Sequence, residues 1–111
     1  MLTLLQSLHY MHKQVAHVDL LDKGSVRRFA VDYKGKHKHL DIFVGNAGAI
    51  DPGLTETGHS RTFTTDYLGH SFLIFELYDM IESTHDSRVV LASSVMHHYA
   101  KTDWKAAADG M

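Results

Sequence analysis

The 111-residue sequence contains no cysteine, which excludes disulfide bonds and thiolate chemistry and suits a reducing compartment. We therefore favour the cytoplasm, although the sequence leaves the location open. The formal net charge is only −2, without a long run of one sign, which argues against a nucleic-acid partner. Proline occurs once, and no apolar stretch predicts a membrane-spanning helix. The remaining composition, 44% hydrophobic and 22% charged, is typical of one globular domain.

Ten histidines are present, and they raise the question of a metal site. The close pairs are His9 and His12, His37 and His39, and His97 and His98. A zinc site needs imidazoles that converge with further ligands, and no pair lies in a motif such as HExxH. We therefore expect surface and loop histidines and no metal.

Apolar periodicity predicts helices that alternate with strands. The expected elements, in order, are a helix over 2–12, a strand over 14–20, a helix between the turn 21–25 and the basic stretch 34–39, a strand over 40–44, a long helix over 59–82 and a strand over 88–92. Asp22 or Ser25 is the expected cap of the second helix, whose buried stripe is Val26, Phe29, Ala30 and Tyr33. This alternation predicts an α/β fold with parallel strands.

The strand over 40–44 is apolar nearly throughout, as expected of a parallel strand covered on both faces. It runs into Gly-Asn-Ala-Gly at 45–48, four residues with almost no side chain to pack. In parallel sheets ligands bind at the carboxyl ends of the strands, where small residues let a ligand approach the backbone. The alternative is a tight turn that needs glycine for a positive φ.

Four stretches resemble, in order, the motifs of the short-chain dehydrogenase/reductase family. They are "VDL" at 18–20, "LDIFVGNAG" at 40–48, "FTTDYLGHSFL" at 63–73 and "RVVLASSVMHH" at 88–98. The form Ser-Ser-x-x-His at 93–97 resembles most the retinol-dehydrogenase-like branch. The resemblance implies a partial Rossmann-like, doubly wound parallel sheet over 1–111, with strands like the third, fourth and fifth of the family. It identifies the chain as an internal fragment of a domain that binds NAD or NADP.

The resemblance also implies roles for particular residues at the cofactor. Asp19 stands where the family's aspartate contacts the adenine ring, and Leu20 follows it. Asn46, Ala47 and Gly48 match the motif that lines the adenine-ribose side of the cofactor. The complete family member would bind a nicotinamide cofactor and a small carbonyl or alcohol substrate.

Two positions carry the implied catalytic roles. Ser94 aligns with the serine that hydrogen-bonds the substrate oxygen. Asp66 takes the place of an asparagine that holds a water in the proton relay, and a carboxylate cannot donate as an amide does. The alternative for Asp66 is an acidic residue favoured by the dipole of a helix start. Gly45 also departs from the motif, which usually has a first asparagine there.

Two family motifs are missing from the sequence. No glycine-rich phosphate loop precedes the strand over 14–20, and no Tyr-x-x-x-Lys follows Ser94, since the residue four positions after Tyr99 is Asp103. General acid–base catalysis typically contributes about 10²- to 10⁴-fold. We therefore expect a fragment of an NAD(P)-dependent oxidoreductase that neither binds cofactor productively nor catalyses by itself.

The family's strand order implies a gap beside the strand over 14–20, because the first two strands lie between the third and the fourth. Exposed strand edges of this kind favour self-association. The alternative function is therefore a non-catalytic interaction module that docks onto a full-length relative through these edges or the long helix. The substrate, and the choice between NAD and NADP, stay open.

Overall fold

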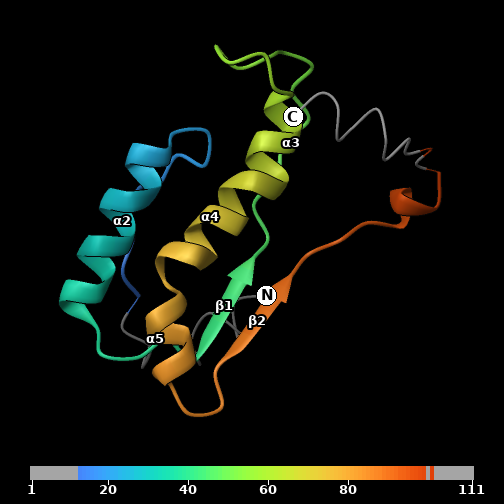
Figure 1. The fold of residues 1–111 in the computed structure, drawn as a ribbon. Coiled ribbons are helices and arrows are strands. Elements are labelled where there is room, and N and C mark those ends of the chain that lie inside the picture. The colour runs from blue at the N-terminus through green and yellow to red at the C-terminus, as the bar shows by residue number, and fades with distance from the viewer. Residues whose placement is uncertain (1–12, 100, 102–111) are drawn as a thin grey trace, which may run out of the picture.

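The computed structural model describes residues 13–99 and 101. The expected helix over 2–12 lies outside these residues, and so does Asp103. The described elements are α2 (Lys23–Lys36), β1 (Ile42–Gly45), α3 (Arg61–Phe63), the π-helical turn η2 (Thr64–Leu68), α4 (Gly69–Glu76), α5 (Tyr78–Ser83), β2 (Arg88–Leu91) and the 3₁₀ turn η3 (Val95–Tyr99). Figure 1 shows two helical runs packed beside a pair of parallel strands, which confirms the α/β class.

Helix α2 begins where the sequence predicts it. Asp22, not Ser25, is the cap, and its Oδ1 accepts the N–H of Gly24 at 2.8 Å. Val26 and Ala30 are fully buried, so the predicted stripe faces the core. The last turn carries two lysines, whose charge is favourable at a helix C-terminus.

The second helical run, α3 to α5, replaces the single long helix predicted over 59–82. It begins at Arg61 because Ser60 is the cap, and the Oγ of Ser60 accepts the N–H of Phe63 at 3.2 Å. The run widens into the π-helical turn η2 and bends at Leu77, which separates α4 from α5. The predicted helix is therefore confirmed in place, with two interruptions.

Strands β1 and β2 pair in parallel, as predicted, with the register running from Ile42–Arg88 to Gly45–Leu91. The prediction that both faces of β1 are covered is wrong. Phe43 is buried, whereas Ile42 and Val44 are 60% and 61% exposed. The reason is that both helical runs pack on the face that carries Phe43.

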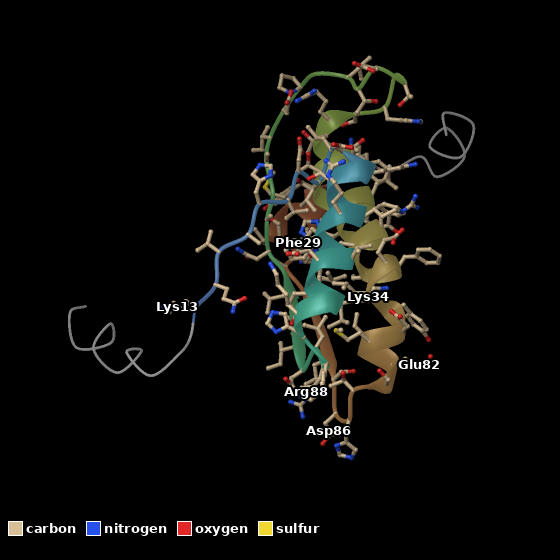
Figure 2. All side chains as sticks on the ribbon, turned by 90° about the vertical axis from the view of Figure 1, so that its left-hand side faces the viewer. Lys13, Phe29, Lys34, Glu82, Asp86 and Arg88 are labelled. Atoms are coloured by element: carbon tan, nitrogen blue, oxygen red, sulfur yellow. The ribbon has the colours of Figure 1, made fainter. Side chains whose placement is uncertain are left out.

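The strand predicted over 14–20 is also wrong, since this segment is coil and the described sheet has only two strands. Val15 is 99% exposed, and Figure 2 shows Lys13 standing away from the helices and strands. The alternating pattern had no neighbouring strand to pair with. Only the end of the segment packs against the helices. A Cβ on Gly69 would lie 2.5 Å from the carbonyl oxygen of Leu20, so position 69 needs a glycine.

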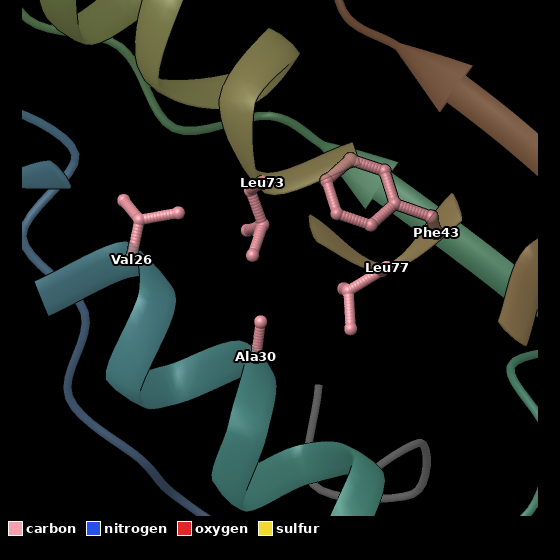
Figure 3. Packing of buried hydrophobic residues seen from close by; sticks show 5 residues of the cluster. All are labelled: Val26, Ala30, Phe43, Leu73 and Leu77. Atoms are coloured by element: carbon pink, nitrogen blue, oxygen red, sulfur yellow. The ribbon is translucent and has the colours of Figure 1, made fainter. Parts of the chain in front are cut away.

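The buried core is small. Val26 and Ala30 of α2 face Leu73 of α4 in Figure 3. Leu77, between α4 and α5, and Phe43 of β1 complete the cluster. Two ion pairs join the helical runs at the surface: Arg27 to Glu76 at 3.1 Å and Lys34 to Asp79 at 3.3 Å. Within the described part of the chain, no helix combines the length and apolar character that crossing a membrane requires.

Candidate functional site

The parallel pairing brings two predicted site segments to one edge of the sheet. Asn46 directly follows β1, and Ala92 to Ser94 follow β2. The Ala92 N–H donates to the carbonyl oxygen of Gly45 at 2.9 Å, so the two strands end side by side. The Asn-Ala-Gly loop and Ser94 therefore share the carboxyl edge, where ligands of parallel sheets bind.

A mostly apolar groove of about 270 Å³ lies along β1, and three predicted cofactor residues line it. Leu20, Asn46 and Ala47 stand in its wall with side chains of the core, such as Phe43 and Leu73. Asp19 and Gly48 do not line the groove. The Oδ1 of Asp19 accepts the N–H of Leu21 at 2.9 Å, which folds the chain into the turn before α2. A second cavity, of about 400 Å³, shares only Leu20 with these predicted residues.

Asp66 has a role that the sequence did not indicate. Its Oδ1 accepts the N–H of Ala49 at 2.9 Å, and Gly48 lies against the same carboxylate. The carboxylate therefore holds the loop after β1 against the second helical run. Asp66 lies within η2, and π-helical turns occur frequently at functional sites. No sequence signal pairs two residues across such a distance along the chain, so the contact could not be predicted.

Ser94 is exposed at the end of β2. Its Oγ accepts the N–H of Met96 at 3.2 Å, and its carbonyl oxygen accepts the N–H of His97 at 3.1 Å. Among residues 13–99 no hydrogen bond joins Ser94, which follows β2, to Asp66, which lies in η2. The structure therefore does not bring the two predicted catalytic residues together by a hydrogen bond. Tyr99, which the sequence argument rejects as a general acid, is 75% exposed.

His70 is a buried residue that the sequence analysis did not single out. It is 6% exposed, and its Nδ1 lies 3.1 Å from the carbonyl oxygen of Thr65. A Cβ on Gly45 would lie 2.8 Å from Cδ2 of His70 and 2.7 Å from Cδ2 of Leu91. These two side chains occupy the space that a side chain at position 45 would need, which is a physical reason for the glycine in the motif.

The loop between β1 and α3 is fixed by a second carboxylate. Asp51 pairs with Arg61, with 2.7 Å between Oδ2 and Nε, and this hydrogen bond together with the N–H of Gly53 lowers the pKa of Asp51. The N–H of Asp51 donates to Oγ1 of Thr62 at 2.8 Å. Within the ranges that the structure describes, no three histidine or carboxylate side chains gather as metal ligands do.

Comparisons with known proteins give several relatives. The WW domain-containing oxidoreductase of Gallus gallus is 33% identical over 100 residues, which cover 88% of this chain and 24% of the relative. Retinol dehydrogenase 11 of Mus musculus is 33% identical, and retinol dehydrogenase 12 of Homo sapiens 34%, each over 89 residues that cover 78% of this chain and 28% of the relative. No family model matches the chain.

Among solved structures, the chain is similar to the crystal structure of an uncharacterized protein from Mycobacterium paratuberculosis. The TM-score is 0.60 at 33% identity, and the match covers 76% of this chain and 29% of that one. The chain therefore spans about a quarter of the length of the relatives it matches.

Proposed function

We propose a function from one premise: the chain belongs to the short-chain dehydrogenase/reductase family, in the retinol-dehydrogenase-like branch. It is the central part of an NAD(P)-dependent oxidoreductase that acts on a carbonyl/alcohol pair, and it is inactive alone. The observation that carries this proposal is the shared edge of β1 and β2, which holds both the Asn-Ala-Gly loop and Ser94. The relatives' names denote oxidoreductases, and two denote dehydrogenases of retinol, an alcohol.

The fold assigned to the whole protein is the doubly wound Rossmann-like sheet. In this assignment β1 and β2 are its fourth and fifth strands. One observation supports it: β1 pairs with β2 in parallel. Residues 1–111 then form part of an NAD(P)-binding domain, and the first two strands would fill the space beside β1.

The described residues fit only part of a nicotinamide cofactor. Leu20, Asn46 and Ala47 line one groove of about 270 Å³, and Asp19 and Gly48 are their neighbours along the chain. We assign these five residues to the adenosine side of the cofactor. A pyrophosphate needs backbone N–H groups at a glycine-rich turn, and the described residues offer no such turn at this edge. This chain alone therefore lacks a complete cofactor site, and we derive no hydride step from it.

Ser94 is the residue assigned to the substrate. Because its Oγ accepts the N–H of Met96, the hydroxyl hydrogen stays available to donate to a substrate oxygen. Asp66 is assigned a positioning role, in which it holds the loop at Ala49 and does not touch substrate. Nothing near Ser94 in the described chain supplies the tyrosine and lysine pair that would move the proton, which is why we assign no activity to the chain alone.

A segment exchange tests the function. Residues 13–98 of this chain replace the corresponding segment of mouse retinol dehydrogenase 11, which supplies the remaining motifs. We expect the chimera to oxidise retinol, and the Ser94→Ala variant to lose about 10²-fold in rate, the cost of removing one hydrogen-bond donor from such a site.

The matched control is Ser93→Ala, which changes the neighbouring serine and should leave the rate within a few-fold. A folded chimera with no activity, or equal losses from the two serine variants, would contradict the proposed function.

The second candidate is a non-catalytic module that docks onto a full-length relative. The observation that favours it is the uncovered side of the sheet, where Ile42, Val44 and Val90 are about half exposed or more. Within residues 13–99, strand β1 also pairs on one edge only, and its open edge could accept a further strand or a second copy of itself. Under this alternative we expect the isolated chain to bind the full-length relative, and we expect Val44→Lys to abolish that binding.

A further inference from the structure

One face of the two-stranded sheet has no helix over it within residues 13–99. Phe43 is buried in the core, whereas the alternate residues Ile42 and Val44 of β1 are exposed. The register places Val90 of β2, also exposed, beside Val44, so the three apolar side chains lie together. We call these three residues the uncovered face. A contiguous group of exposed apolar side chains marks a surface that another element or molecule covers.

Residues 1–12 join the described structure on this side of the sheet. In Figure 2, Lys13 stands on the side of the strands that is away from the second helical run. Val15 is almost fully exposed, so the chain beside Lys13 packs against little of the described fold. A segment attached at Lys13 can therefore reach the uncovered face without passing around either helical run.

The sequence of this segment has the pattern that such a face requires. Leu4, Leu5, Leu8 and Met11 follow helical spacing, and residues 1–12 include no Asp, Glu, Lys or Arg. An isolated helix shorter than about 12–15 residues is marginal in water, and it gains stability by packing its apolar stripe against another element. The apolar stripe and the uncovered face therefore each need a partner.

The dimensions of the two surfaces agree. A helix over 2–12 is about 16 Å long, at a rise of about 1.5 Å per residue. The four residues of β1 extend over about 13 Å, at about 3.3 Å per residue. A helix with its side chains is about 10 Å wide, and neighbouring strands lie about 4.8 Å apart. One such helix is therefore large enough to cover both strands.

We propose that residues 2–12 form an amphipathic helix that packs on the uncovered face within the same chain. Leu8 lies at the centre of the apolar stripe and rests on Val44 and Val90. Arg88 pairs with Ile42 in the register, and it meets no like charge because the segment carries no lysine or arginine. The inference goes beyond the proposed function. The helix occupies the face on which the second candidate depends, so a full-length relative must displace the helix before it docks there.

The absence of cysteine allows a direct test with paired thiols. The double variant Leu8→Cys, Val44→Cys places two thiols across the proposed contact. Under mild oxidation of the full 111-residue chain at micromolar concentration, we expect a disulfide within one chain, seen as faster migration on a non-reducing gel. It should form on the order of 100-fold faster than disulfides between chains, because a tethered thiol has a millimolar effective concentration.

The matched control is Gln6→Cys, Val44→Cys, which has nearly the same tether but places the first thiol on the opposite side of the helix. A disulfide needs Cβ atoms about 3.5–4.5 Å apart, so this pair should close at least about tenfold more slowly. In a second measurement on the full chain, we expect Leu8→Lys to lower the urea midpoint by about 1 M, because it removes one buried leucine, and Gln6→Lys to leave the midpoint unchanged.

Three outcomes would overturn the proposal. The first is an equal rate of closure for the Leu8 and Gln6 pairs, and the second is an equal urea midpoint for Leu8→Lys and Gln6→Lys. The third is that Leu8→Cys, Val44→Cys forms disulfides mainly between chains, since a second copy would then cover the face. Far-UV circular dichroism of each reduced variant checks before oxidation that the fold is retained.

Discussion

At the scale of single residues, the candidate site depends on how the Asn-Ala-Gly loop is held. A loop of small residues has few side-chain contacts of its own, so its position must come from elsewhere. Asp66 provides it through the hydrogen bond from the Ala49 N–H. An asparagine at position 66 would offer the same acceptor oxygen, so the aspartate in this chain preserves the contact while it replaces the family's residue.

Removing the acceptor at position 66 should therefore loosen the loop. We expect Asp66→Ala to lower the free energy of unfolding by about 1 kcal/mol, the usual net value of one hydrogen bond, and to speed hydrogen exchange at the Ala49 amide. Asp66→Asn is the matched control and should change neither quantity much. Unchanged exchange at Ala49 in Asp66→Ala would show that the carboxylate does not hold the loop.

The glycine at position 45, where the family motif has asparagine, is explained only by side chains that are distant in sequence. The motif of the family has asparagine there, and the sequence offers no reason for the glycine. In the structure the imidazole of His70 and the side chain of Leu91 fill the space where a Cβ would lie. The reason becomes visible only when α4 and β2 are placed beside β1.

At the scale of elements, the sequence predicts those helices and strands whose position depends on interactions between residues close in sequence. Helix α2 has its cap at Asp22 and its buried stripe within its own residues, so its position follows from the sequence alone. The segment 14–20 has an equally regular pattern, but a strand needs a partner. Because β1 pairs only with β2 among the residues that the structure describes, that pattern does not produce a strand. The hydrogen bond of Asp66 and the bend at Leu77 are likewise tertiary features.

The packing between the helical runs should depend on Leu77, which lies at the bend between α4 and α5 and is 2% exposed. We expect Leu77→Ala to lower the free energy of unfolding by about 2–5 kcal/mol, because it leaves a cavity beside Ala30 and Phe43. Leu54→Ala makes the same change at a side chain that is 65% exposed and should cost little. Urea unfolding followed by circular dichroism measures both, and equal effects would contradict the assigned core.

At the scale of the whole molecule, charged contacts at the surface tie parts of the fold together. Lys34 joins α2 to α5 through Asp79, and Arg61 joins the loop after β1 to α3 through Asp51. The hydrogen bonds from the Lys34 and Arg61 side chains lower the pKa values of Asp79 and Asp51 in the folded chain. Both carboxylates therefore stay ionised more readily in the folded state than in the unfolded state.

This difference fixes the direction of the pH dependence. Above the ordinary aspartate pKa of 3.8 the stabilisation is fully present, and it is lost as the pH falls through the lowered pKa values of the folded state. We expect the urea midpoint to be flat from neutral pH to about pH 5 and to drop below pH 4. The double variant Asp51→Asn, Asp79→Asn should show a smaller drop, and an identical drop would mean that these pairs do not contribute.

We propose that the chain carries residues of the adenosine side of a nicotinamide-cofactor site without the means to bind the whole cofactor. Calorimetric titration of the folded 111-residue chain with NADPH and NADH tests this proposal. We expect no saturable heat at micromolar to millimolar cofactor for a chain that shows a cooperative urea transition. Saturable micromolar binding that is lost with Asn46→Ala would contradict it, because the groove along β1 would then suffice without a glycine-rich phosphate loop.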